Sequence, residues 1–574
     1  MNIFKKLSKA LLSLTAGTVM ATAAAAQGPA NHLVNVEWLE ANLDRPDLLL
    51  IDASPTPLYV KGHIQGAISI SFPHEESVSQ GLNVSYGGGG DYYFDTTAPY
   101  AWQEAPRATF QAAYEDWGID ESKTIVIYDQ GGTFFATRLF YSLFYHNFPL
   151  DKVYVLDGGL HKWQAQGYEV TTEVFKPAQK GGFRIKEENN TIKATLEEFV
   201  NAGRDPEANA LVEALWHRQH TGAVRAYSKV GHIPHAISAP FHDFFNEDRT
   251  FKSPAEIQRM LDYLGIGRDQ VIYTHCGGGI AGSVPFFAIK VLAQYPDVRH
   301  STESQMGYLH DPRDLPFWTY SAPYLMRDTQ WLQWWGGQRT RTLGSIHVSI
   351  LDVRSQDDYK SGHIPFALSV PAEEVKASLT DRSKLAALLG KAGVNPAHEA
   401  VIVSGGRVDK DAALAYLALE ALGQKKVSIY NDAIEDWAAR GHALSDQDTV
   451  VAPQTIRFDV NVPPVEYAPE APRKDVLITD PASTQGLYPR VYLASGKELP
   501  ASLPEGKVVH VPYTELLDTD GRPKAADVIA KVLEDAGLSR YAEVVAVSDD
   551  ISEAAVNYYA LKLLGYPDLK VLAL

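Results

Sequence analysis

The stretch Val271-Ile-Tyr-Thr-His-Cys-Gly-Gly-Gly-Ile-Ala-Gly-Ser283 contains the only cysteine of the chain, Cys276. Its first three residues are β-prone and predict a buried strand, the glycines predict a tight turn, and Pro285 suits the first turn of a following apolar helix. In such a loop, unpaired backbone N–H groups and the helix dipole stabilise a negatively charged sulfur or a bound anion. The alternative is a small buried cysteine beside a structural turn, because free cysteine is often buried.

The same pattern of strand, loop and helix occurs four times along the chain. The other three loops follow the strands Ile125–Tyr128, Val401–Val403 and Val544–Val547, and Gly-His-Ile recurs at Gly62, Gly231 and Gly362. The loops are spaced by roughly 130 to 150 residues, which is the size of a domain. Strands that alternate with helical runs predict an α/β fold, with four tandem domains that each contain a small parallel sheet flanked by helices.

The Cys-led loop between a strand and a helix resembles the active-site loop of the rhodanese, or sulfurtransferase, family. The resemblance implies that Cys276 attacks a sulfane-sulfur donor, holds the sulfur as a persulfide and passes it to a thiophilic acceptor. Members of the family that use thiosulfate place Arg or Lys directly after the cysteine, whereas this chain has Gly277 and Gly278. Members that use mercaptopyruvate have Cys-Gly-Ser-Gly-Val-Thr, and Gly278 stands at the position of that serine. The donor therefore stays open between thiosulfate and 3-mercaptopyruvate.

The resemblance implies a catalytic Cys276 and a loop whose backbone N–H groups stabilise the charge on sulfur. The loop residues are Gly277, Gly278, Gly279, Ile280, Ala281 and Gly282. Glu213-Ala-Leu215 stands where the family often has Asp-x-Arg, so an arginine used for donor binding is missing. The candidate anion contacts are Arg218, Arg225, Lys229 and His275. His275 is also explained as a packed residue, because neighbours along a strand point to opposite faces.

Four histidines of the second domain have spacings that resemble those of metal ligands, namely His217, His220, His232 and His235. His232 occupies the same repeat position as His63 and His363, although only one of these domains has a cysteine. His232 is therefore predicted to belong to the scaffold, and no metal or cofactor is expected.

The predicted domains cover residues 31–170, 191–322, 340–445 and a degenerate 475–574, with linkers at 176–182 and 446–474. In the first domain Asp129 replaces the cysteine, and in the fourth domain two aspartates lie in the equivalent loop. In the third domain Ser404 stands at the cysteine position, but no Gly-x-Ser-x-Gly motif of a serine nucleophile surrounds it. The second domain is thus the catalytic candidate. The insert Ser77–Ala105 is either a lid or a surface excursion. For the aromatic segments Phe317-Trp318 and Trp331–Trp335, packing between domains is favoured over an exposed partner surface.

The N-terminus has the features of a secretory signal peptide, predicted to span residues 1–26. Lys5, Lys6 and Lys9 precede an apolar run and the small-residue tract Ala23–Gln27. We therefore expect an exported protein, located in the periplasm of a Gram-negative bacterium, with no membrane span. The formal net charge of −18 makes nucleic acid and anionic membranes poor partners.

Two functions from different classes remain. The first is an exported sulfurtransferase whose partners are a small sulfur donor and a thiophilic acceptor. The second is a scaffold or sulfur-carrier protein, built of degenerate rhodanese domains, that docks another periplasmic protein of sulfur metabolism. Phosphatase chemistry is disfavoured because no arginine lies between Cys276 and Ser283 to clamp a phosphate.

Overall fold

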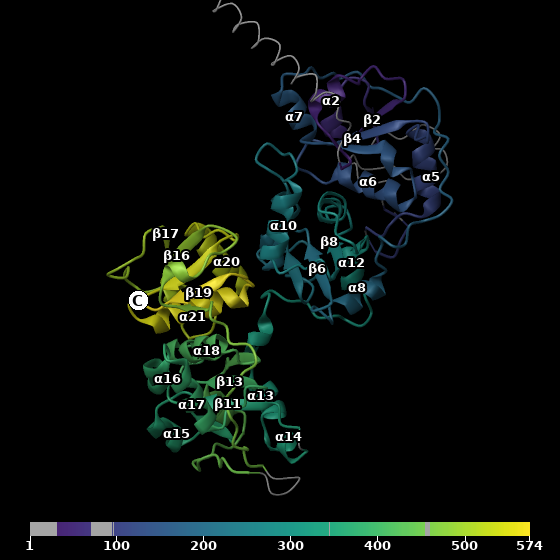
Figure 1. Ribbon diagram of the computed structural model, residues 1–574. Helices are drawn as coiled ribbons and strands as arrows, with labels where there is room; N and C mark the ends of the chain where they lie inside the picture. Colours follow the sequence, from purple (N-terminus) through teal and green to yellow (C-terminus); the bar gives the residue numbers. More distant parts are fainter. Residues whose placement is uncertain (1–30, 71–93, 96, 101, 344, 454–459) are drawn as a thin grey trace, which may run out of the picture. The chain divides into compact units, whose positions relative to one another are not determined.

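The computed structural model describes residues 31–70, 94–95, 97–100, 102–343, 345–453 and 460–574 (Figure 1). The predicted signal peptide and most of the predicted insert lie outside these residues. Within the described residues, no helix combines the length and the apolar character needed to cross a bilayer. The chain divides into two compact units. The first comprises residues up to His220 together with Ala226–Phe317, and the second comprises Thr221–Arg225 together with Trp318–Leu574.

The first sheet of the first unit has the strand order β1-β5-β4-β2-β3, and all its pairs are parallel. The central strand β4 leads through the loop at Asp129 into α6. The strands are β1 (Leu33–Val34), β2 (Leu48–Asp52), β3 (Ile68–Ser69), β4 (Thr124–Tyr128) and β5 (Val153–Leu156). The helices are α2 (Val36–Glu40), α3 (Thr56–Tyr59), α5 (Arg107–Asp116), α6 (Phe135–Tyr145) and α7 (Gly159–Ala165).

The second sheet of this unit has the order β7-β6-β8-β9 and is also parallel. At its edge, a single parallel bridge between Lys193 and His300 takes the place of a fifth strand. The strands are β6 (Asn209–Glu213), β7 (Ala236–Ser238), β8 (Val271–His275) and β9 (Val298–His300). The helices are α8 (Leu196–Ala202), α9 (His217–His220), α10 (Pro254–Tyr263), α11 (Ser283–Phe286) and α12 (Ser304–Leu309).

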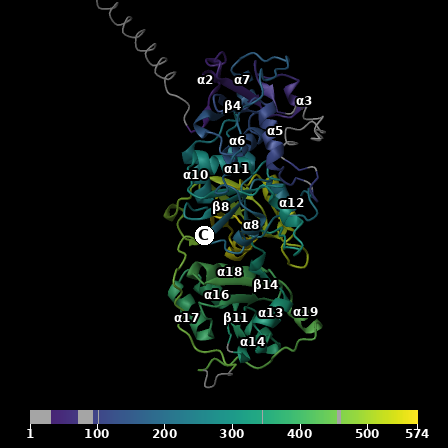
Figure 2. The same ribbon diagram turned by 90° about the vertical axis from the view of Figure 1, so that its right-hand side faces the viewer.

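The helix predicted after the cysteine loop begins at Ser283 as α11 and continues from Phe287 to Leu292 as a π-helix. It packs against α6, the helix that follows the equivalent loop of the first sheet (Figure 2). Thr137 Oγ1 and Ser283 Oγ lie 2.9 Å apart and form a hydrogen bond between the two helices. The rings of Phe140 and Phe287 meet edge to face with centroids 4.8 Å apart. The two domains of this unit are therefore joined through their loop-following helices.

The second unit repeats this construction with two five-stranded parallel sheets, ordered β10-β14-β13-β11-β12 and β15-β19-β18-β16-β17. The strands are β10 (Met326–Arg327), β11 (Val348–Asp352), β12 (Ala367–Ser369), β13 (Glu399–Val403), β14 (Lys426–Tyr430), β15 (Leu477–Ile478), β16 (Arg490–Ala494), β17 (Lys507–His510), β18 (Glu543–Val547) and β19 (Leu569–Leu572). The helices are α13 (Thr329–Trp335), α14 (Gln338–Thr342), α15 (Gln356–Ser361), α16 (Ala372–Ser378), α17 (Arg382–Ala392), α18 (Lys410–Leu422), α19 (Ile434–Ala439), α20 (Ala526–Asp535) and α21 (Ile551–Leu563).

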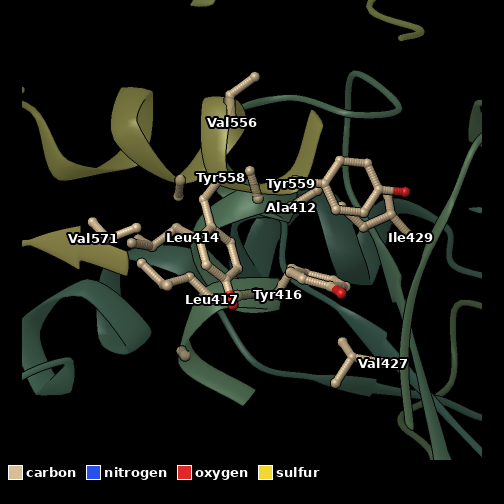
Figure 3. Packing of buried hydrophobic residues seen from close by; sticks show 14 of the residues in the cluster. Ala412, Leu414, Tyr416, Leu417, Val427, Ile429, Val556, Tyr558, Tyr559 and Val571 are labelled. Carbon is tan, nitrogen blue, oxygen red and sulfur yellow. The ribbon is translucent and has the colours of Figure 1, made fainter. Parts of the chain in front are cut away.

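The two sheets of the second unit share one hydrophobic core. Helices α18 and α21 lie between them and make the most extensive helix contact in the chain's described part (Figure 1). Tyr416 of α18 meets Tyr559 of α21 with ring centroids 4.9 Å apart, and both rings are buried (Figure 3). The predicted α/β fold with four small parallel sheets flanked by helices is confirmed.

The tryptophan segment is only partly packed within its own unit. Trp331 packs partly buried against the core of the third sheet. Trp334 and Trp335 are 49% and 52% exposed, with the Arg339 guanidinium over the Trp334 ring. Only the first of the three rings is therefore taken up by packing within its own unit.

Candidate active site

Cys276 lies at the carboxyl end of β8, directly after the last residue of the strand, and is 3% exposed. β8 pairs with β6 on one side and β9 on the other, so the loop emerges from the middle of the sheet. The carboxyl ends of parallel strands are the usual place for ligands and reacting groups in α/β sheets. The local sequence thus places the thiol where the fold offers a site.

The loop holds the thiol sulfur against its own backbone. The Gly279 N–H donates to Cys276 Sγ across 3.2 Å. Gly279 has φ +78°, and a Cβ at this position would lie 2.1 Å from the carbonyl oxygen of Thr302. Glycine is required here for both its conformation and its lack of a side chain. We predicted that backbone N–H groups of residues 277–282 stabilise the sulfur. Within the described residues, the Gly279 N–H is the loop group that makes this hydrogen bond.

Residues of β9, of α12 and of the strand before the loop make further hydrogen bonds that hold the cysteine loop in place. His300 Nε2 lies 2.9 Å from the Gly279 carbonyl oxygen, and its Nδ1 lies 3.1 Å from Thr274 Oγ1. The Cys276 N–H donates to Ser304 Oγ, and its carbonyl accepts from the Gln305 N–H at 3.0 Å. Because these hydrogen bonds fix the loop backbone from β9 and α12, the loop is held in place before any donor arrives.

Two aromatic side chains cover the glycines that follow the cysteine. The Tyr227 hydroxyl oxygen lies 1.7 Å from the point that a Cβ of residue 277 would occupy. The Trp102 ring lies 2.8 Å from the corresponding point at residue 278. The two rings meet edge to face with centroids 6.0 Å apart. Burial, followed by the charge of the nearby Cys276, raises the pKa of Tyr227, so its hydroxyl stays protonated at neutral pH.

Trp102 belongs to the part of the insert that the structure describes. Tyr100 stacks on His310 with centroids 4.7 Å apart, and its hydroxyl hydrogen-bonds Glu303. Glu104 forms ion pairs with Arg138 of α6 and with Lys193. Residues of the insert beyond Phe94 therefore reach across to the second domain and place an aromatic ring on the cysteine loop. Sequence reasoning marked the insert but not this ring.

The four residues predicted to contact an anion lie in different environments. Lys229 Nζ lies 2.6 Å from Asp314 Oδ1 and 2.9 Å from the Leu315 carbonyl oxygen, so these groups engage its charge. His275 is fully buried with its ring against Phe199, and burial lowers its pKa to about 4. That placement argues against anion binding, because the imidazole is neutral and faces the core.

The two remaining candidates, Arg218 and Arg225, are exposed. Arg218 is the second residue of α9, and Arg225 is the last residue of the short segment Thr221–Arg225, which is assigned to the second unit.

A buried polar cluster lies beneath the loop and was not predicted. Glu213, at the end of β6, is fully buried and hydrogen-bonds His220, while its other oxygen accepts from Gln305 Nε2 at 2.6 Å. Gln305 also donates its backbone N–H to Cys276, so the Glu213 carboxylate positions the loop through Gln305. The change from Asp-x-Arg to Glu213-Ala-Leu215 was the sequence signal for this rearrangement, which exchanges an arginine for a histidine and an amide.

The histidine at the repeated Gly-His-Ile position is part of the scaffold, as predicted. His63, His232 and His363 are buried, and each stacks on a second ring: Tyr59, His220 and Tyr359 respectively. The Nδ1 of each lies 2.7 to 2.8 Å from the backbone carbonyl of that same partner. Within the described residues, no group of three or more His, Cys, Asp or Glu side chains could hold a metal ion.

The three loops without cysteine are filled by their own carboxylates. Asp129 accepts from the N–H groups of Gly131, Phe135 and Ala136 at 2.8 to 3.1 Å. In the third domain Asp409 accepts from Gly406 and Ala412. In the fourth, Asp550 accepts from Ser552 and forms ion pairs with Lys376 and Lys410. In each of these loops an aspartate carboxylate already accepts from backbone N–H groups.

Comparison with known proteins agrees with this geometry. Residues 35–166 and 340–440 match the family described as rhodanese-like domain, and the other two sheets repeat the same strand order. These two segments of the chain are therefore rhodanese-like domains.

The alignments with individual relatives cover about half of this chain. It is 26% identical over 286 residues to a Mycobacterium leprae protein named "Putative thiosulfate sulfurtransferase", covering 48% of this chain and 94% of the relative. It is 26% identical over 283 residues to "Sulfur carrier protein TtuD" of Thermus thermophilus, covering 47% of this chain and 90% of the relative. The solved structure of the Escherichia coli 3-mercaptopyruvate enzyme SseA matches with TM-score 0.40 and 22% identity, over 48% of this chain and 98% of that one.

Proposed function

We propose that the protein is a sulfurtransferase that carries sulfane sulfur on Cys276. The observation that supports this proposal is the contrast among four equivalent loops. Only the second places a cysteine sulfur at the carboxyl end of the central strand with a backbone N–H directed at it. The other three have an aspartate carboxylate against the loop backbone. One loop is thus built for sulfur chemistry and three are closed to it.

The proposed cycle has two steps. In the first, the Cys276 thiolate attacks the outer sulfur of the donor, a new S–S bond forms, and the donor remnant leaves with the electron pair of the bond that breaks. In the second, a thiophilic acceptor attacks the outer sulfur of the persulfide, and Cys276 leaves as the thiolate. The Gly279 N–H stabilises the sulfur charge in both steps. The cycle needs no cofactor or metal.

The wall of the site favours a donor of low charge. The atoms nearest to the Cβ positions of residues 277 and 278 belong to Tyr227 and Trp102, which are aromatic and uncharged. A dianion such as thiosulfate gains most from a cation beside the sulfur, as in an Arg or Lys contact. We therefore propose 3-mercaptopyruvate as the better donor of the two.

The test is loading of the purified full chain with thiosulfate and, separately, with 3-mercaptopyruvate, followed by intact mass measurement before and after cyanide. We expect a gain of one sulfur atom that cyanide removes, and faster loading by 3-mercaptopyruvate. Cys276→Ser should abolish the gain completely because no other thiol exists. If neither donor loads the wild-type chain, the proposal fails.

A carrier or scaffold is the second candidate. The three closed loops favour it, because a chain with one reactive loop in four devotes most of its surface to something other than turnover. A carrier would load once and hand its sulfur to a protein partner, whereas an enzyme would turn over small donors and acceptors repeatedly. Multiple turnovers with cyanide would decide for the enzyme. Export to the periplasm remains a prediction, tested by fractionation of cells that express the full chain.

A further inference from the structure

We propose that the Tyr227 hydroxyl donates a hydrogen bond to the outer sulfur carried on Cys276, and that Trp102 holds the Tyr227 ring in position for this. The inference rests on the proposed sulfur transfer and names the side chain that takes the place of the missing cation. It makes Tyr227 a catalytic residue, since its hydroxyl would touch the transferred atom.

The position of the hydroxyl is the first argument. Its oxygen occupies the space that a side chain at residue 277, next to Cys276, would fill. The Tyr227 hydroxyl makes no hydrogen bond with any described residue, although the residue is half-buried. A half-buried tyrosine usually finds a partner for its hydroxyl. Among the described residues the hydroxyl therefore has no partner, so it can donate to a group that arrives at the cysteine loop during the reaction.

The reach of the persulfide is the second argument. The thiol sulfur itself is held by the Gly279 N–H and has no hydrogen bond to Tyr227. Loading adds one S–S bond of about 2.0 Å, which moves the outer sulfur away from the loop backbone. Tyr227 and Trp102 lie against the first two glycines after the cysteine. The loop N–H thus serves the inner sulfur and the phenol serves the outer one.

The protonation state is the third argument. Because burial and the neighbouring Cys276 raise the pKa of Tyr227, the phenol keeps its proton beside an anionic sulfur. Such a group donates without adding a positive charge to the wall. In the transfer step the outer sulfur passes to the acceptor, the electron pair of the breaking S–S bond returns to Cys276, and the hydroxyl proton stays on oxygen throughout.

The support of the ring is the fourth argument. Trp102 meets Tyr227 edge to face and comes from the first domain. Its neighbours Tyr100 and Glu104 are tied to the second domain by the Glu303 hydrogen bond and the Lys193 ion pair. The tyrosine is thus held by a segment that is itself anchored on both sides, which limits the rotation of the phenol.

The experiment compares wild type with Tyr227→Phe, which keeps the ring and its contact with Trp102 but removes the hydroxyl. The control is Tyr295→Phe, which removes a hydroxyl that accepts from Gln258 in the same domain. Each chain is titrated with 3-mercaptopyruvate and the persulfide fraction is read by intact mass. The rate of persulfide alkylation is measured against pH.

We expect Tyr227→Phe to need about tenfold more donor for half loading, as for loss of a hydrogen bond to a charged group. We also expect its alkylation midpoint to move upward by about one pH unit, because the anionic persulfide loses a donor. Tyr295→Phe should match wild type in both measurements.

Three results would overturn the proposal. If wild type and Tyr227→Phe load equally and share one pH profile, the hydroxyl has no such role while sulfur transfer itself stands. If Tyr227→Phe melts several degrees below wild type, the hydroxyl is a structural group. If wild type takes up no sulfur from either donor, the proposed function fails and this inference fails with it.

Discussion

At the residue scale, the three glycines after Cys276 lack side chains for three different reasons. Gly277 faces the Tyr227 hydroxyl, Gly278 faces the Trp102 ring, and Gly279 approaches a backbone carbonyl with a positive φ. The first two neighbours are side chains from distant parts of the chain, and only the third reason is local. The first two glycines are therefore explained by tertiary contacts, and the third is explained by its backbone conformation.

Gly277→Ala tests the first of these reasons. The added methyl would displace the Tyr227 phenol against its contact with Trp102, so the free energy of unfolding should fall by about 1–3 kcal/mol. Displacement of the hydroxyl should slow sulfur loading by roughly tenfold. The matched control is Gly405→Ala in the third domain, where a Cβ meets no atom within 4 Å. Loading of Gly277→Ala at the wild-type rate would contradict this account.

At the element scale, β9 supports the cysteine loop through His300. This ring lies between the Gly279 carbonyl and Thr274, and burial lowers its pKa to about 4. Nε2 lies 2.9 Å from the Gly279 carbonyl oxygen, and Nδ1 lies 3.1 Å from both the carbonyl oxygen and the hydroxyl of Thr274. Protonation would place a positive charge on a fully buried ring, which costs free energy in the folded state.

The pH dependence follows from this. The unfolded histidine binds a proton below its usual pKa of about 6.5, while the folded one stays neutral down to about pH 4. Stability is therefore present above the unfolded pKa and is lost as pH falls through this window. Between pH 7 and pH 5, His300 should account for a loss of about 2 kcal/mol.

The measurement is chemical unfolding of wild type and His300→Gln at pH 7 and pH 5. His300→Gln should lose about 2 kcal/mol less between the two pH values, since it has no proton to take up on unfolding. The exposed His161→Gln serves as the control and should follow wild type. Equal losses in wild type and His300→Gln would show that His300 is protonated in the folded state at pH 5.

At the scale of the whole molecule, each unit is a pair of sheets joined through the helices that follow the four equivalent loops. These are α6 and α11 in the first unit, and α18 and α21 in the second. In the second unit the contact between these helices belongs to one hydrophobic core that both sheets share. Tyr416, Leu417 and Tyr559 are fully buried in it (Figure 3). The two domains of this unit should therefore unfold together.

Leu417→Ala tests this cooperativity. Truncation of a fully buried leucine leaves a cavity and should lower the free energy of unfolding of the second unit by about 2–5 kcal/mol. Hydrogen exchange followed by mass spectrometry should show faster exchange in both β13 and β18, with no change in β4 and β8. The control is Leu487→Ala, whose side chain is 51% exposed. Faster exchange in β13 alone would mean that the two domains unfold independently.

The sequence by itself determined much of this protein, because the relevant signals are local. Hydrophobic runs of strand length, glycine turns and repeated Gly-His-Ile triplets predicted four small parallel α/β domains, and the structure contains four such sheets. The repeat position also identified His232 as a scaffold residue. The single cysteine placed the candidate chemistry in the second loop. Each of these inferences needed only residues that are near neighbours along the chain or copies of one pattern.

Only the tertiary structure decided what surrounds Cys276. Tyr227, Trp102 and the Glu213–Gln305 pair come from four separate segments that meet because the sheet order brings their ends to one edge. The same strand order places Lys229 beside Asp314 and buries His275 in the core. Spacing along the chain carries no information about such meetings, since a side chain's neighbours depend on strand order and helix packing. The loop could therefore be found from sequence, whereas its aromatic wall could not.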